Sequence, residues 1–176
     1  MIKGENTMNA KLIVEGKEFE IEILDPELQK LVAPPKKMTG YERVNKSEPY
    51  WYEDTVGVES AIEEDDNVDL EFYNTADYYS DKTVAENNFR ADKLMRQLRR
   101  FAVEHREKEL DWSDITMDKY QIYYEKIYSR TLCACAVYYQ RNIGGVYFDS
   151  RETVQLAIDT FHDELIWYFT EYKDSL

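Results

Sequence analysis

Few residues of this sequence have the types and spacing that chemistry requires. Cys133 and Cys135 are its only cysteines. They lie two residues apart on a predicted strand, so their side chains should point to the same face. Disulfide geometry between two such neighbours is difficult to satisfy. A C-x-C pair could bind a metal, but no second Cys or His pair lies near it, and His105 and His162 are isolated. We therefore expect both thiols to be reduced in the core, with no metal.

A run of thirteen residues contains seven acids and no Lys or Arg, and it is the first candidate for a binding site. Asp65-x-Asn67-x-Asp69 resembles the start of a calcium-binding EF-hand loop, but Leu70 occupies the position that requires Gly. The run is either a solvated loop between strands or a surface that imitates phosphate and fills the basic groove of a nucleic-acid-binding protein. Its acids are Glu59, Glu63, Glu64, Asp65, Asp66, Asp69 and Glu71.

A basic strip lies on one face of the helix predicted over about residues 81–106, opposite an apolar stripe with a period of 3.6 residues. These side chains either form intramolecular salt bridges with the acidic run or lie in solvent. Alternatively they bind an acidic partner, including a second copy of the chain in a homodimer. The strip consists of Arg90, Lys93, Arg96, Arg99 and Arg100.

A second long helix is predicted over about residues 151–172 by the same periodicity. Three of its apolar side chains, Leu156, Ile166 and Trp167, lie off the predicted buried stripe. They either pack against the N-terminal part of the chain or form an apolar interface with a partner.

No catalytic motif is present: the sequence contains no nucleophile elbow, Walker loop, dinucleotide-binding glycine pattern or H-E-x-x-H. We therefore expect a protein that is not an enzyme and that needs no cofactor. The formal net charge of −14 argues against nucleic acid as a direct ligand, because that binding relies on Lys and Arg. No apolar run is long enough to cross a membrane, so a cytoplasmic protein is expected.

The first 48 residues are expected to form a small module and a linker. Residues 1–7 read as a leader that is not native to the protein, with translation starting at Met8. Alternating apolar and polar residues then predict a hairpin, and Asp25 followed by Pro predicts the start of a short helix, which completes a module over residues 8–33. Residues 34–48 are basic and contain Pro, as linkers often do.

The main domain, residues 49–176, is expected to be a duplicated unit. Residues 80–84 and 150–154 share Ser, Thr and Val at an offset of 70, and each half, about 49–106 and 112–176, pairs Tyr-rich strands with one long helix. Short aromatic strands should precede both helices, and a central strand is expected within residues 127–140. The predicted fold class is α+β: a β-sheet with two long helices, built from a duplicated antiparallel strand–helix unit and preceded by the hairpin–helix module.

The chain resembles small accessory proteins of phages and prophages of low-GC Gram-positive bacteria. The resemblance rests on the hairpin of residues 11–23, on segments 34–44 and 50–52, and on Tyr-rich segments such as 73–80. It implies a phage accessory protein and supplies no catalytic residues. With the acidic run, it favours a non-enzymatic inhibitor of a host defence protein in the bacterial cytoplasm, an anti-CRISPR that blocks a nucleic-acid-binding effector such as Cas9. A self-associating structural or regulatory phage protein is the alternative.

Overall fold

The structure is a computed structural model that describes residues 8–14, 17–25, 27–29, 37–127, 131–137 and 141–174. The chain divides into two compact units, Met1–Met38 and Thr39–Leu176. Helices and antiparallel two-stranded sheets occur together among the described residues, so the α+β class is confirmed. The leader expected over residues 1–7 lies outside the described residues.

The first unit contains a two-stranded antiparallel hairpin, β1 (Met8–Val14) and β2 (Lys17–Ile23). Along one face of β2 the side chains become progressively buried, since Phe19 is exposed, Ile21 half-buried and Ile23 buried. Asp25 begins a helical turn as predicted, because its carboxylate accepts hydrogen bonds from the amides of Glu27 (2.8 Å) and Leu28 (3.3 Å).

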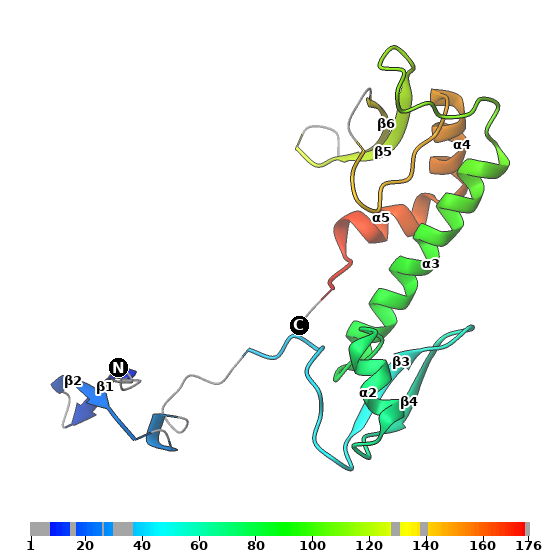
Figure 1. Ribbon diagram of the computed structural model, residues 1–176. Helices are drawn as coiled ribbons and strands as arrows, with labels where there is room; N and C mark the ends of the chain where they lie inside the picture. The colour runs from blue at the N-terminus through cyan, green and yellow to red at the C-terminus, as the bar shows by residue number, and fades with distance from the viewer. Residues whose placement is uncertain are drawn as a thin grey trace. The chain divides into compact units, whose positions relative to one another are not determined.

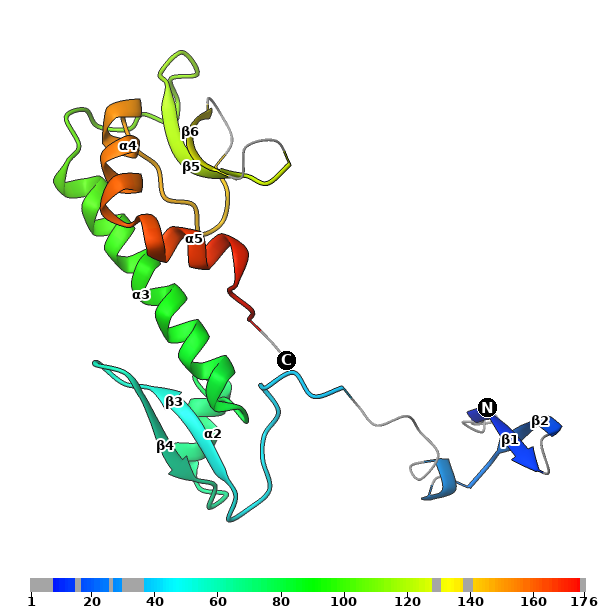
Figure 2. The same ribbon diagram turned by 180° about the vertical axis from the view of Figure 1, so that it is seen from behind.

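The second unit begins with the hairpin of β3 (Pro49–Glu53) and β4 (Val58–Ile62), followed by helix α2 (Asn67–Asn74) and the long helix α3 (Lys82–Glu104). A second hairpin, β5 (Lys119–Glu125) and β6 (Thr131–Val137), precedes helices α4 (Arg151–Thr160) and α5 (His162–Thr170). Figures 1 and 2 show α3 running from the β3–β4 hairpin to the β5–β6 hairpin, with α4 and α5 beside its C-terminal half.

The main core lies where α3, α4 and α5 meet the β5–β6 hairpin. A smaller core lies under the β3–β4 hairpin. The predicted apolar stripe of α3 is confirmed, because its side chains are buried. Burial of this face is the main source of stability for an amphipathic helix. The main core consists of Leu94, Leu98, Phe101, Ala102, Phe148, Val154, Ala157, Ile158 and Leu165.

The predicted second long helix is wrong, because the chain leaves helical geometry at Phe161, which has φ −113° and ψ 22°. Thr160 lies just before the break and its hydroxyl bonds the Leu156 carbonyl at 2.7 Å, a local bond of the kind that competes with the helix ladder. The break separates α4 from α5 and lets Phe161 pack edge-on against Phe101, with ring centroids 5.6 Å apart.

The strands also differ from the prediction, because in the described part of the chain they form separate two-stranded hairpins and not one sheet. The central strand expected within residues 127–140 is β6, which pairs only with β5 in the described part of the chain. The two aromatic strands contract to isolated bridges, Tyr79 with Trp51 and Phe148 with Tyr120. Among the described residues, no helix combines the length and the apolar character needed to cross a membrane.

Residues 39–48, which the sequence placed in the linker, belong to the second unit. The carbonyl of Gly40 accepts a hydrogen bond from the Ser80 amide at 2.7 Å, and the Tyr41 and Tyr79 rings lie 5.3 Å apart. Gly40 has φ 93°, and a Cβ there would lie 2.7 Å from Val84 Cγ2. Glycine is therefore required where this segment crosses the start of α3.

Candidate functional site

The acidic run is not a single loop but the end of β4, a turn and the first half of α2. Asp66 is the N-cap of α2, and its carboxylate accepts hydrogen bonds from the amides of Val68 (2.8 Å) and Asp69 (3.0 Å). Asp69 completes a capping box by accepting the Asp66 amide at 3.3 Å. Part of the charge is therefore used to start the helix.

Glu63 is completely buried and forms the centre of an internal ion pair. Arg43 binds it bidentately, through Nε at 3.1 Å and Nη2 at 2.7 Å, and the Tyr78 hydroxyl donates to it at 2.7 Å. The Arg43 bond and then the Tyr78 bond outweigh the desolvation of the carboxylate and hold the pKa of Glu63 at about 2. Glu63 is therefore unavailable to a partner.

Asp69 is buried beside this pair and accepts a hydrogen bond from the Tyr50 hydroxyl at 2.9 Å and from the Glu64 amide at 2.7 Å. Burial and the Asp69 carboxylate raise the pKa of Tyr50. The Tyr50 and Tyr78 rings stack with centroids 4.1 Å apart, which joins the two buried carboxylates in one network. The expectation that the run lies outside the core is wrong at Glu63 and Asp69.

The other acids of the run lie on β4, the turn and α2, are all exposed, and are together called the acidic surface below; some apolar side chains near them in the sequence are exposed as well. Leu70 and Tyr73, both 42% exposed, lie three residues apart on one face of α2 and so adjoin each other. Ile62 and Val68 are also exposed. The acids of this surface are Glu59, Glu64, Asp65, Asp66 and Glu71.

The basic strip does not form one continuous free surface. Arg90 is bound bidentately by Glu164 of α5, at 2.7 and 3.1 Å, and Arg100 pairs with Glu104 at 3.7 Å. Lys93, Arg96 and Arg99 are exposed, and in the described part of the chain none has a carboxylate within salt-bridge distance. None of the strip's described salt bridges involves the acidic run.

The expected apolar interface contains a core residue. Trp167 is only 8% exposed, and the Arg90 guanidinium lies 3.9 Å from the centre of its ring. Trp167 is therefore covered by α3, and its assignment to an interface was wrong because the break at Phe161 changes the direction of the second helix. Ile166 is half-buried, and Leu156 remains 48% exposed.

The cysteines differ in burial. Cys133 is half-buried, and desolvation raises the pKa of its thiol, whereas Cys135 is exposed, so the prediction of a core position is wrong for Cys135. The described residues contain no group of three or more His, Cys, Asp or Glu side chains that could hold a metal ion.

Sequence reasoning missed Arg43 and Glu42, because both stand in the segment read as a linker. Glu42 accepts hydrogen bonds from the Thr39 amide (2.9 Å), the Thr39 hydroxyl (3.0 Å) and the Gly40 amide (3.0 Å), and these bonds lower its pKa to about 2. No local pattern pairs Arg43 with Glu63, which is twenty residues away.

Comparison with known proteins found no matching family model, no matching curated protein and no matching solved structure.

Proposed function

We propose that this chain is a phage-encoded, non-enzymatic protein that binds a host defence protein. More specifically, we propose that the chain is an anti-CRISPR that acts in the bacterial cytoplasm and blocks a nucleic-acid-binding effector such as Cas9. The resemblance of the sequence to phage accessory proteins supports the source, and the net charge of −14 supports a basic target, since opposite charge accelerates association.

The observation that carries the proposal is the rigid display of the exposed acidic surface. The buried bonds of Glu63 and Asp69 hold β4 and α2 in place, so the exposed acids project from fixed backbone rather than from a solvated loop. Leu70 and Tyr73 add exposed apolar area beside them. An apolar patch surrounded by charge is typical of a protein interface, where the apolar contacts contribute affinity and the charges contribute rate and orientation.

The test is DNA cleavage by a panel of Cas9–guide RNA complexes in the presence of this protein. Replacing Glu59, Glu64 and Glu71 by Lys should weaken inhibition by more than about tenfold, because like charges would then face the basic groove. These three exposed side chains are neither the buried pair nor the cap, so the fold should persist. Inhibition by the unchanged protein should also weaken steeply with salt.

A matched control reverses Glu107, Asp159 and Glu171, which are exposed and lie outside the acidic surface. Both triple variants change the net charge from −14 to −8, so a general charge effect would weaken them equally. Equal inhibition by the two variants, or no inhibition of any complex, would contradict the proposal.

The duplication of the second unit also remains a proposal, supported by its bridges. Trp51 and Tyr120, and likewise their partners Tyr79 and Phe148, are 69 residues apart (120 − 51 and 148 − 79). The N-caps Asp81 and Ser150 have the same spacing (150 − 81). These bridges and caps therefore support an offset of 69 residues between the two halves, one residue less than the offset of 70 read from identical residues.

Self-association as a structural or regulatory phage protein is a second candidate, favoured by the exposure of Leu156 at 48%. A Leu156→Ser variant should then convert a discrete oligomer to monomer in light scattering. A monomeric wild-type protein would exclude this candidate.

A further inference from the structure

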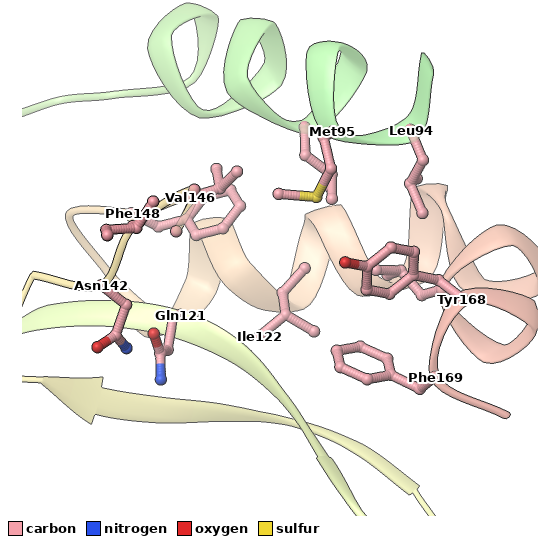
Figure 3. A pocket seen from close by; sticks show the side chains of 14 residues that line it. Leu94, Met95, Gln121, Ile122, Asn142, Val146, Phe148, Tyr168 and Phe169 are labelled. Atoms are coloured by element: carbon pink, nitrogen blue, oxygen red, sulfur yellow. The ribbon is translucent and has the colours of Figure 1, made fainter. Parts of the chain in front are cut away.

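A cavity of about 400 Å³ lies where α3, β5 and α5 meet the turn before Phe148 (Figure 3). This volume falls in the range of about 300 to 1,000 Å³ that is usual for small-molecule sites. Most of the lining is apolar, as expected for a site that takes the apolar part of a ligand. Its apolar side chains include Leu94, Met95, Leu98, Ile122, Leu165 and Phe169.

Three polar side chains also line the cavity: Gln121, Asn142 and Tyr168. Figure 3 shows the Tyr168 hydroxyl pointing into the space between Met95 and Ile122. Neither the Tyr168 hydroxyl nor the two amide ends form a hydrogen bond with any part of the chain that the structure describes. The Tyr168 hydroxyl is thus a polar group that points into a mostly apolar cavity, as is typical of a site that orients a ligand.

A second hollow, which adjoins the cavity at the turn of residues 142–145, is basic. Its lining adds Arg99 from α3 and Arg141 to this turn. Within the described ranges, neither guanidinium has a carboxylate at salt-bridge distance, whereas Arg43 and Arg90 both do. Arg141 lies 5.4 Å from the centre of the Trp112 ring, and no described residue accepts a hydrogen bond from its guanidinium.

The turn between the cavity and the arginines is fixed by its own residues. The Gly145 amide bonds the Asn142 carbonyl at 3.1 Å, and Gly144 between them has φ 76°, a value that favours glycine. A Cβ on Gly145 would lie 2.8 Å from the hydroxyl of the buried Tyr147, which itself accepts the Asn142 amide. The wall of the site is thus already formed without a ligand.

We propose that this cavity binds a small amphipathic carboxylate, with its apolar chain between α3, β5 and α5 and its carboxylate at Arg99 and Arg141. The apolar lining selects the chain, and the two guanidinium groups select the negative end. The site is separate from the acidic surface and does not depend on the proposed inhibition.

The test uses the full chain and a dansyl-labelled undecanoic acid, whose fluorescence reports binding in an apolar site. Decanoate should displace this probe at a concentration about tenfold lower than decanol, which has the same chain length and no charge. Decyltrimethylammonium should be the weakest competitor. Absence of saturable probe binding, or equal competition by decanoate and decanol, would overturn the proposal.

Two matched double variants separate the site from a general charge effect. Arg99→Gln with Arg141→Gln should raise the dissociation constants of the probe, measured by direct titration, and of decanoate, calculated from displacement with that probe constant, about tenfold each and leave that of decanol unchanged. Lys93→Gln with Arg96→Gln removes the same charge from exposed positions outside the cavity lining and should change none of these constants. Equal losses in both variants would contradict a carboxylate site at Arg99 and Arg141.

The position of the ligand can be read from amide chemical shifts. Decanoate should shift the amide signals of Gln121, Gly144 and Gly145 by NMR, because these residues line the cavity. Shifts confined to α2 or to the β3–β4 hairpin would place binding elsewhere and overturn the proposal. Because none of the four substituted side chains is in the core, loss of folding is not expected to obscure the result.

Discussion

At the scale of single residues, the buried Glu63 shows how an acidic residue can stabilise a protein that already carries excess negative charge. Its carboxylate is completely buried yet accepts hydrogen bonds from Arg43, Tyr78 and the Asp65 amide. Removing one partner of such a pair leaves the other unsatisfied, so the loss exceeds that of a surface pair. Glu63 thus differs physically from Glu59 and Glu64 of the same run, which are exposed.

Glu63→Gln should lower the free energy of unfolding at pH 7 by about 2 kcal/mol, because the amide cannot pair with Arg43 as a carboxylate does. The pKa of Glu63 is lowered in the folded protein from an ordinary 4.5 to about 2. A lowered folded-state pKa stabilises the protein above the unfolded-state pKa, and this stabilisation is lost as the pH falls from about 4.5 to 2.

Urea unfolding of Glu63→Gln and wild type between pH 7 and pH 2.5 measures this difference directly. The difference in the free energy of unfolding between the two proteins should shrink below about pH 4.5. Glu59→Gln should not differ from wild type in this way, since Glu59 is exposed. A difference that is constant over the whole range would contradict the internal ion pair.

At the scale of elements, α3 and α5 are joined through Arg90, which pairs with Glu164 and lies 3.9 Å from the centre of the Trp167 ring. Asn87 and Asn88 extend this contact, since Asn87 donates to the Lys173 carbonyl at 3.3 Å and Asn88 accepts from the Tyr172 hydroxyl at 2.6 Å. The exposed ion pair contributes little by itself, so burial of the Trp167 ring is the main stabilising term.

Trp167→Ala should therefore cost about 3 to 5 kcal/mol in the free energy of unfolding, as for other large-to-small core substitutions. Leu156→Ala, at a position that is 48% exposed, should cost less than about 1 kcal/mol. Chemical denaturation measures both. A small loss for Trp167→Ala would indicate that this side chain is not part of the core and would restore its interface role.

At the scale of the whole molecule, the two apolar core clusters found among the described residues lie in the second unit, residues 39–176. The first unit contains a two-stranded hairpin, a structure that is only marginally stable alone in water. The stability of the second unit should therefore be determined by its own contacts.

Residues 39–176 produced alone should keep the far-ultraviolet circular dichroism and the cooperative thermal transition expected of an α+β domain, because they include both clusters. A chain shortened further to residues 49–176 should lose about 2 kcal/mol or more, since it lacks Arg43 and leaves Glu63 buried without its partner. Equal stability of the two fragments would contradict the inclusion of residues 39–48 in this unit.

The sequence by itself determined the local elements. The period of 3.6 residues predicted α3 within about two residues of its observed ends, and Asp25 correctly predicted a helix start. The alternation of residues predicted the first hairpin. These features depend on neighbours within a few positions of one another, so a local pattern is sufficient to find them.

Only the tertiary structure decided which charged and aromatic residues are free to act. Arg43 meets Glu63 across twenty residues, Arg90 meets Glu164 across 74, and the bend at Phe161 places Trp167 beneath α3. The sequence shows seven acids in one run, but the fold buries two of them, Glu63 and Asp69, inside the protein. The physical reason is that the energy of a charge depends on its solvent exposure and its partners, which are set by contacts between distant parts of the chain.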